Sequence, residues 1–462
     1  MGSIFIFTRD LRLEDNTGLI MALKNSDYVL PVFIFDSHQI AHNQYKSNNC
    51  IQFMIECLDD LNEELHRHNS RLFYFYSDDY ENTVRKIIKK SEKYEIGSIY
   101  ITMDYTPFAK KRQHVLEKIC KTMGMTLNVV EDHMLTGAEK VKKDTGDYYM
   151  KFTPYYRTAI KQDVATPVKN THKNYVKKTY SIPGEYDGDI HRFYLKNNNV
   201  LVKGGRKNGL NILKHIKNFK NYNTGREIPS ENGTTKLSAY MKFNVISVRE
   251  IHRTFSKNLS KNNKLFVQLY WRDFYMQIMN NFDVIKQPMN KNYNIKWEND
   301  DTKIKKWKSG NTGIPLVDAA MREMNTSGWM HNRCRMIVSN FLVKILRCDW
   351  MIGEKYFAQN LVDYDPANNN GGWQWSSSTG VDSMPSFRVF NPWRQAEKYD
   401  KECKYIKKWI PELENVPEKD ILHWDTEWKK YKKIKYNEPI VSDIREEFKK
   451  TLKLYDKRTQ WD

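Results

Sequence analysis

The sequence lacks the features that mark membrane, secreted and metal-binding proteins. No apolar run approaches the roughly 20 residues that span a bilayer, and no basic region followed by an apolar one opens the chain. The six cysteines form no C-x-x-C pair and show no zinc-binding spacing. These absences predict an intracellular protein with reduced thiols, no membrane partner and no metal.

Nucleotide-binding signatures and internal repeats are also missing. Neither G-x-G-x-x-G nor a Walker A sequence occurs, so the sequence does not support a tightly bound dinucleotide of the usual kind. What remains is a globular chain of 462 residues, long enough for two or three domains with sizeable cores.

Basic and aromatic residues are abundant. The chain has 75 Lys and Arg against 56 Asp and Glu, a formal net charge of +19, which favours a polyanion such as nucleic acid. Lysine-rich solubility is the alternative. The 13% of aromatic residues, with 12 Trp, are more telling, because aromatics stacked beside cations hold exposed bases.

The first 130 residues alternate short β-rich runs with helical patterns. The runs are 3–7, 28–35, 71–76, 98–101 and 126–130, and the helical segments between them are 17–25, 51–68, 80–94 and 109–123. Asp15 or Asn16 can cap the first helix. This alternation predicts a doubly wound, Rossmann-like α/β domain with a parallel sheet, whose ligands would bind at the carboxyl ends of the strands.

Periodicity weakens from about residue 131 to 203, which predicts a long connector, and the chain is helical from there onward. In the helical part GTTKLS (233–238) offers hydroxyls near a helix start. This is a weak signal for phosphate binding, because Thr and Ser cap helices routinely, and capping is the favoured explanation. In the helix 264–279, Gln268, Trp271, Arg272 and Tyr275 share one face. They form either a base-stacking surface or one side of a buried helix.

The segments 328–347 and 363–375 are the most informative. A core stripe at helical spacing runs along the first segment from Met330 to Ile345, while Asn332, Arg335 and Met336 form a second face. The second segment, DYDPANNNGGWQW, places two acids, two adjacent glycines and two tryptophans together. Trp373 and Trp375 should point to roughly opposite sides of a helix, one inward and one toward a cavity.

Taken together, these stretches resemble the photolyase/cryptochrome flavoprotein family, and most closely its class I cyclobutane pyrimidine dimer photolyases. The motifs are TRDLRLEDN, GTTKLS, WRDFY, GWMHNRCRM, DYDPANNNGGWQW and FRVFNPWRQAEKYD, in conserved order along essentially the whole chain. The resemblance implies an α/β antenna domain over residues 1–131, a connector over 132–203, and a helical domain over 204–462 that binds FAD and the DNA lesion.

The resemblance also implies a set of flavin-binding residues. Thr234, Thr235 and Ser238 would lie at the phosphates, and Asp363 and Asp365 at the ribose and flavin ring. Arg335 would pair with the acid, and Asn369 would face the flavin N5, where it favours the reduced, anionic flavin. The remaining implied contacts are Tyr222, Lys236, Leu237, Gln268, Arg272, Trp329 and Tyr364.

The implied reaction is light-driven splitting of a cyclobutane dimer in UV-damaged DNA by electron transfer, carried out by a monomer. Trp297, Trp350 and Trp373 match the family's electron-transfer chain. Trp271 and Trp375 would flank the flipped lesion, and Gln268, Asn332 and Met336 would contact its thymines. The further implied DNA contacts are Arg226, Arg272, Tyr275, Arg333, Arg388 and Gln395.

Two departures from the family pattern bear on substrate and antenna. Gln268 stands where dimer photolyases usually carry Glu, a feature shared with (6-4) photolyases, but Asn332 and Met336 stand where those enzymes carry two histidines. Pro107 stands where a folate-binding Glu can occur, which leaves the second chromophore, methenyltetrahydrofolate or a deazaflavin, open. The alternative functions are a (6-4) photolyase and a cryptochrome-type blue-light photoreceptor without repair. The expected location is wherever the DNA lies, cytoplasm or nucleus.

Overall fold

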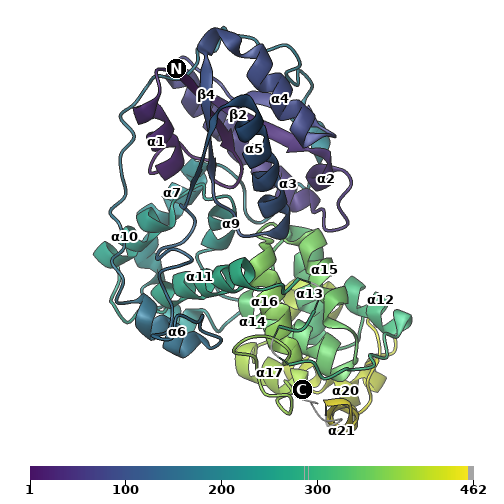
Figure 1. The fold of residues 1–462 in the computed structure, drawn as a ribbon. Helices are drawn as coiled ribbons and strands as arrows, with labels where there is room; N and C mark the ends of the chain where they lie inside the picture. The colour runs from purple at the N-terminus through teal and green to yellow at the C-terminus, as the bar shows by residue number, and fades with distance from the viewer. Residues whose placement is uncertain (286, 290, 456–462) are drawn as a thin grey trace.

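The computed structural model describes residues 1–285, 287–289 and 291–455, and shows an α/β layer above a larger helical body (Figure 1). Five parallel strands form one sheet in the order β3-β2-β1-β4-β5. They are β1 (Gly2–Phe7), β2 (Val29–Asp36), β3 (Phe73–Ser77), β4 (Ile96–Thr102) and β5 (Thr126–Val130).

Helices cover both faces of the sheet, which confirms the predicted doubly wound α/β fold. The phenylalanines of β1 pack with α1 (Thr17–Asn25) and α3 (Asn48–Arg67), whereas its isoleucines pack with α4 (Tyr80–Lys90) and α5 (Pro107–Met123). β1 and β2 are buried along their whole length, as expected of central parallel strands. Of the two predicted caps of α1, Asn16 is the one used, and it accepts a hydrogen bond from Leu19 N at 3.1 Å.

Strand order places β1 beside β4 although they are far apart in sequence, so the loops after these two strands lie at the switch point of the sheet. Arg9 follows β1 and Asp104 follows β4, and their side chains pair at 3.2 Å. Arg9 Nε also donates to the Lys242 carbonyl of the helical body at 3.0 Å. The edge of the sheet formed by the carboxyl ends of its strands therefore faces the helical body.

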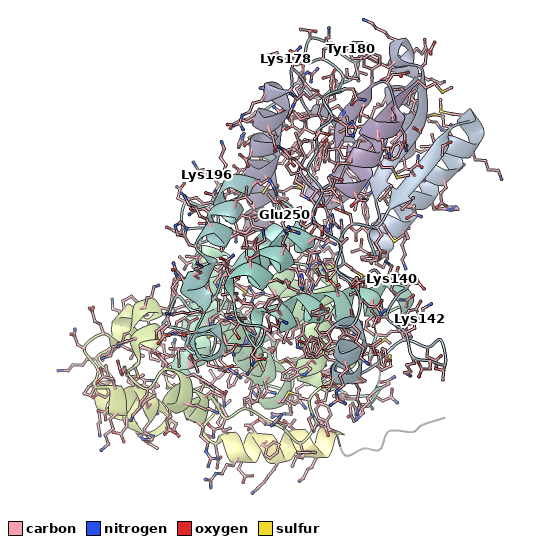
Figure 2. The ribbon with its side chains drawn as sticks, turned by 90° about the vertical axis from the view of Figure 1, so that its left-hand side faces the viewer. Lys140, Lys142, Lys178, Tyr180, Lys196 and Glu250 are labelled. Carbon is pink, nitrogen blue, oxygen red and sulfur yellow. The ribbon has the colours of Figure 1, made fainter. Side chains whose placement is uncertain are left out.

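The segment predicted as a connector is largely irregular but well packed against both parts of the protein. Tyr175 bridges to Val29 beside the sheet, and Val176 is buried in the sheet core. Phe152 and Tyr155, in α6 (Phe152–Ala159), pack against the helical body. Figure 2 shows this span: Lys178 and Tyr180 lie beside the sheet, and Lys140 and Lys142 lie beside the helical body.

The rest of the described chain is helical, as predicted, and none of its helices is long and apolar enough to cross a bilayer. The predicted stripe from Met330 to Ile345 is buried. Its helix continues into one π-helical turn, Phe341–Ile345. The helices are α7 (Arg206–Lys214), α8 (Tyr222–Gly225), α9 (Leu237–Lys242), α10 (Val248–Asn258), α11 (Leu265–Asn281), α12 (Asp301–Ser309), α13 (Pro315–Ser327), α14 (Asn332–Asn340), α15 (Trp350–Asn360), α16 (Pro366–Ser377), α17 (Pro392–Tyr399), α18 (Lys404–Trp409), α19 (Glu418–Leu422), α20 (Trp424–Glu427) and α21 (Ile444–Tyr455).

A buried charge network joins the two parts. The Asp132 carboxylate, fully buried at the end of the sheet domain, pairs with Arg12 and with Arg249 of α10, the latter at 2.7 Å. Arg249 also pairs with Asp15 at 3.0 Å. Burial alone would raise the pKa of Asp132, but the two guanidinium groups outweigh it and lower that pKa to about 2.

We predict that Asp132→Ala lowers the free energy of unfolding by about 3–5 kcal/mol, because it leaves two arginines buried with one counter-charge fewer. Since the folded pKa is depressed, the contribution of this carboxylate is full above its unfolded pKa of about 4 and is lost as the pH falls toward 2. Urea unfolding of the wild type and variant at pH 7 and pH 3 measures both effects. A loss below about 1 kcal/mol at pH 7 would contradict the assigned role.

Candidate functional site

A cavity of about 600 Å³ lies in the helical body, lined by residues from α8, α9, α11, α14 and α16 and from the segments before α9 and α16. This volume falls within the range of about 300–1,000 Å³ typical of ligand pockets. Every residue predicted to hold the flavin lines it: Tyr222, Thr234, Thr235, Lys236, Leu237, Ser238, Gln268, Arg272, Trp329, Arg335, Asp363, Tyr364, Asp365 and Asn369.

Most residues predicted to contact DNA or the lesion line the same cavity, namely Arg226, Gln268, Trp271, Arg272, Tyr275, Asn332, Met336 and Trp375. Arg333, Arg388 and Gln395 do not. Arg388 is exposed beside Phe387, which is 68% exposed, and Gln395 is half-buried on α17. Arg272 is only 6% exposed and donates to the carbonyls of His133 and Met241, so it belongs to the cavity wall and not to an open surface.

One acid of the cavity is held by residues far away in the sequence. Asp363 accepts hydrogen bonds from Ser238 Oγ at 2.8 Å and from Arg335 Nη2 at 3.0 Å. Arg335 is fixed further by its donation to the Met330 carbonyl and lies 5.0 Å from the Trp329 ring centre. The ion pair that the sequence implied between Arg335 and an acid is thus present, with Asp363 as the acid.

The second acid is held across the domain boundary. Asp365 caps α16 by accepting from Asn368 N at 3.0 Å, and it pairs with Arg9 of the sheet domain at 2.5 Å. Burial would raise the pKa of Asp365, but Arg9 and Lys242 outweigh it and hold that pKa well below its usual range. This carboxylate therefore stays charged at neutral pH.

The side-chain amide of Asn369 has a defined orientation. Its Nδ2 donates to the Glu354 carbonyl and to Glu354 Oε1, both at 3.0 Å. A backbone carbonyl can only accept, so the amide nitrogen must face Glu354 and the Asn369 oxygen must face the cavity. The cavity thus presents a hydrogen-bond acceptor where the flavin N5 is expected, which suits a flavin that carries a proton there.

The two adjacent glycines of α16 have different neighbours. A Cβ atom added at Gly371 would lie 2.2 Å from the Tyr275 ring, so Gly371 allows α11 and α16 to approach. A Cβ at Gly372 would meet nothing within 4 Å, although Gly372 lines the cavity. Its bare backbone leaves room that a flat ring bound against α16 would fill, which fits a flavin.

The tryptophans around the cavity differ from the prediction in part. Trp375 is half-buried and borders the cavity, as expected. Trp373 points into the core, with its ring 4.9 Å from Phe357, but it also borders the cavity. The division into one inward and one cavity-facing indole is therefore only partly correct, because the cavity extends around the side of α16.

Trp271 is stacked flat on Phe152 of α6, with ring centres 3.6 Å apart and planes 8° apart. The ring of Tyr275 lies 5.6 Å away on the same helix. Phe152 thus fixes one face of the indole. A residue of the connector supports the aromatic wall of the cavity, which the sequence pattern did not indicate.

The three tryptophans of the predicted relay occupy one region. Trp350 and Trp373 are each 2% exposed within the same hydrophobic cluster, and Trp297 packs half-buried at its edge. Trp373 contacts the ring of another tryptophan, Trp307, whose centre lies 6.1 Å away. Trp307 also contacts Tyr356, with ring centres 5.8 Å apart. Trp307 was not among the predicted relay residues.

Several residues at the site escaped sequence reasoning. Lys242 lines the cavity, Asn368 supports Asp365, and Glu354 orients Asn369. Glu227 pairs with Arg333 and lies 3.6 Å from Arg226, so one acid partly neutralises two predicted DNA-binding cations. Only Asn368 stood inside a motif singled out as functional, and no periodic signal marked the others.

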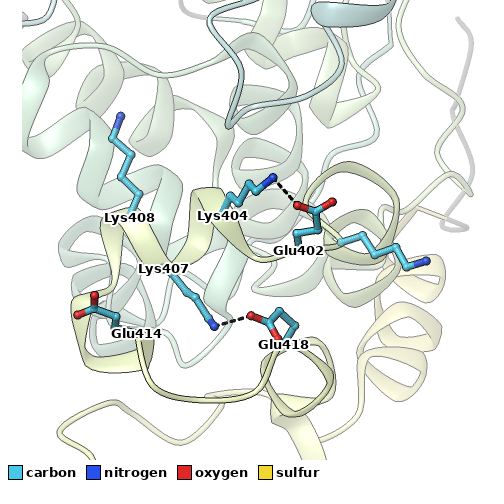
Figure 3. A pocket seen from close by; sticks show the side chains of 7 residues that line it. Glu402, Lys404, Lys407, Lys408, Glu414 and Glu418 are labelled. Carbon is cyan, nitrogen blue, oxygen red and sulfur yellow. Dashed lines mark hydrogen bonds and ion pairs between the residues drawn. The ribbon is translucent and has the colours of Figure 1, made fainter.

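A second hollow, of about 840 Å³, lies on the surface around α18 and is formed by Lys401, Glu402, Lys404, Lys407, Lys408, Glu414 and Glu418. Figure 3 shows Lys404 paired with Glu402 and Lys407 with Glu418, the latter at 2.6 Å. Its lining consists of charged, mostly exposed side chains, four of which form these two ion pairs, so the smaller, more enclosed cavity is the candidate site. Within the described residues, no group of three His, Cys, Asp or Glu side chains is placed to hold a metal.

Comparison with known proteins finds two matching family models, "DNA photolyase" over residues 3–172 and "FAD binding domain of DNA photolyase" over residues 265–457. The chain is 35% identical to the deoxyribodipyrimidine photo-lyase of Buchnera aphidicola subsp. Acyrthosiphon pisum, covering 94% of this chain and 93% of that protein. The deoxyribodipyrimidine photo-lyase of Vibrio cholerae is 30% identical, with 97% and 98% covered.

Solved structures agree. An archaeal photolyase from Sulfolobus tokodaii, determined with two FAD molecules, matches with a TM-score of 0.86 and 38% identity over 99% of this chain and 100% of that chain. A cryptochrome from Synechocystis matches with a TM-score of 0.89 and 25% identity over 98% and 99%. The sheet domain and helical body described above are thus shared with both.

We predict that Gly372→Ala folds normally but loses most of its bound flavin, because the new methyl group occupies cavity space that the ring needs. Gly371→Ala should instead lower the melting temperature, since its methyl group collides with Tyr275. Flavin absorbance per protein and thermal unfolding measure the two effects. Full flavin occupancy in Gly372→Ala would contradict this position for the ring.

Proposed function

The chain belongs to the DNA photolyase family, and on this premise we propose that it binds FAD and splits cyclobutane pyrimidine dimers in DNA by light-driven electron transfer. One observation carries the proposal: the residues expected to hold the flavin and most of those expected to hold the lesion line a single cavity. Bound FAD, in its reduced and photoexcited form, supplies the electron to the dimer.

The chain's own residues provide the environment for the flavin. Thr234 and Thr235 supply hydroxyl donors, and Lys236 supplies an ammonium donor, suited to the phosphates. The Ser238 hydroxyl, which was also expected at the phosphates, donates to Asp363 instead. Arg335 and Asp363 form an ion pair that would lie at the ribose. Because the Asn369 oxygen faces the cavity, it would accept a hydrogen bond from N5–H of the flavin, which favours the reduced form.

Lesion binding follows from the aromatic wall and the cations outside it. Trp271, whose other face is covered by Phe152, and Trp375 border the cavity and would stack against a base turned out of the duplex. Extrusion costs a few kcal/mol and less at a damaged, poorly stacked site, which favours the lesion. Arg226, Arg333 and Arg388 would contact phosphates and make binding salt-dependent.

We propose that the protein acts as a monomer.

The cavity lining supports the cyclobutane dimer over the (6-4) lesion. It contains no histidine among the described residues, and neither Asn332 nor Met336 can transfer a proton near neutral pH. His331 is adjacent, but it is 4% exposed, its burial lowers its pKa to about 4, and its Nδ1 accepts from Arg333 N. Gln268 supplies an amide that both donates and accepts hydrogen bonds to the thymines.

The test is illumination of the reduced protein with two oligonucleotides, one carrying a cyclobutane thymine dimer and the other a (6-4) photoproduct. Restored thymines are counted by chromatography. We expect restoration of the first alone, which shows that Gln268 suffices. If neither is restored although FAD is bound and photoreduced, the repair function is wrong and a light-sensing function replaces it.

A second experiment concerns the electron relay. Trp350→Phe should block photoreduction of the oxidised flavin but leave dimer splitting by chemically reduced protein intact, because only the route from the surface is interrupted. Trp307→Phe is the matched comparison, since Trp307 contacts Trp373 but lies outside the predicted relay. Absorbance under continuous blue light measures both. Loss in Trp307→Phe with retention in Trp350→Phe would move the route to Trp307.

A further inference from the structure

Two arginines expected to bind DNA phosphates share one carboxylate beside the cavity. Arg226 follows α8 and lines the cavity, and Arg333 lies next to the cavity residue Asn332 at the start of α14. The Glu227 carboxylate accepts a hydrogen bond from Arg333 Nη2 and lies 3.6 Å from Arg226 Nε. Glu227 therefore joins two elements of the helical body across 106 positions of the sequence.

Each of the two arginines also lies on an aromatic ring. The Arg333 guanidinium is 4.5 Å from the ring centre of Tyr399 on α17, and its Nη1 lies 4.0 Å from Met336 Sδ. The Arg226 guanidinium is 5.5 Å from the ring centre of Tyr222. Both distances fall within the range of about 6 Å in which a ring attracts a cation. The arginines are therefore fixed beside Met336, expected at the lesion, and Tyr222, expected at the flavin.

Glu227 supplies what the rings lack, a negative charge between the two cations. Among the residues that the structure describes, no other carboxylate lies within ion-pair distance of Arg226 or Arg333. The side chains of these arginines are 20% and 16% exposed, so water screens their mutual repulsion only in part. Without the carboxylate, the two neighbouring like charges would move apart. Glu227 thus keeps both guanidinium groups beside the cavity.

The same carboxylate has a second effect on DNA, because it repels phosphates. Non-specific binding to a duplex depends on how many phosphates are neutralised by cations, and an acid beside two of those cations weakens it. Binding of the lesion depends in addition on where the cations lie relative to the base that is turned out of the duplex. Glu227 therefore weakens binding to undamaged DNA and supports binding to the lesion.

We propose that Glu227 is a positioning residue that sets the preference of the protein for damaged over undamaged DNA. It holds Arg226 and Arg333 in place for the phosphates next to the flipped dimer, and its charge opposes contact with duplex that has no base to insert. The proposal rests on the lesion binding of the proposed function. It adds to that function a residue that does not line the cavity itself.

The experiment measures equilibrium binding of the flavin-loaded protein, kept in the dark, to two duplexes of the same sequence, one with a cyclobutane thymine dimer and one without. Glu227→Gln keeps the length of the side chain and a hydrogen-bond acceptor but removes the charge. The affinity for undamaged DNA should rise about tenfold at low salt, with a salt dependence steeper by about one counterion. The affinity for the dimer should not rise, because the lost positioning offsets the lost repulsion.

Glu81→Gln is the matched control. Glu81, on α4, also pairs with two cations, Arg85 on the same helix and Lys118 on α5, but it lies in the sheet domain and outside the cavity lining. The same loss of one charge there should leave the preference for the dimer unchanged. Glu227→Asp keeps the charge on a shorter side chain, so its affinity for undamaged DNA should match that of the wild type while its affinity for the dimer falls.

The outcomes separate the inference from the proposed function. Equal tightening on both duplexes in Glu227→Gln would overturn the inference alone, because the acid would then act only by its charge. An unchanged affinity of this variant for undamaged DNA, or loss of its flavin absorbance, would also overturn it. If the wild type itself bound both duplexes equally, the lesion binding of the proposed function would be wrong and the inference would fall with it.

Discussion

A carboxylate that stays charged inside a protein needs a counter-charge, and Asp365 obtains it from the other domain. Arg9 lies in the loop after β1, at the switch point of the sheet, and pairs with Asp365 at the start of α16. Because isolated buried charges are so unfavourable, this pair ties the edge of the sheet to the helix that carries Asn369, Trp373 and Trp375. The network of Asp132 with Arg12 and Arg249 holds the same boundary a short distance away. These ion pairs, together with the apolar cluster that spans the same boundary, hold the two parts in place around the cavity.

Helix α16, of twelve residues, both packs in the core and lines the cavity. Asp365 caps it, Asn369 faces the cavity, Gly371 lets the ring of Tyr275 come close, and Trp373 anchors it in the core. Gly353 of α15 permits that anchoring, since a Cβ there would lie 2.0 Å from the Trp373 ring. Side-chain choice on this helix is therefore governed by close packing on one side and by space for a ligand on the other. This explains why its composition departs so far from that of an ordinary amphipathic helix.

Sequence periodicity was sufficient for the sheet, for the helices on both its faces and for the buried stripe from Met330 to Ile345, because each follows from local spacing. The cavity residues were predicted from motifs. That they lie in one cavity was expected only from the family resemblance, because their spacing along the chain does not indicate it. Glu354, Glu227 and Phe152 could not be found in this way. Each acts through a contact with a residue far away in the sequence, at a separation of 15, 106 and 119 positions, respectively. A single Glu or Phe does not form a periodic pattern or a motif that sequence analysis could detect. The connector showed no periodic pattern because the contacts that fix it to the rest of the protein, such as Val176 N to the Val29 carbonyl and Tyr186 N to the Tyr74 carbonyl, are with distant segments.

The stacking of Phe152 on Trp271 has a consequence for protein engineering. The helical body is one continuous stretch of the sequence, but three residues from the first third of the chain support the residues that line its cavity. Arg9 pairs with Asp365, Tyr45 stacks on Tyr364, and Phe152 stacks on Trp271. If that body were joined to an unrelated domain, Trp271 would lose its stacking partner Phe152. Asp365 at the start of α16 would lose its counter-ion Arg9. A transplantable module must therefore include the sheet and the connector.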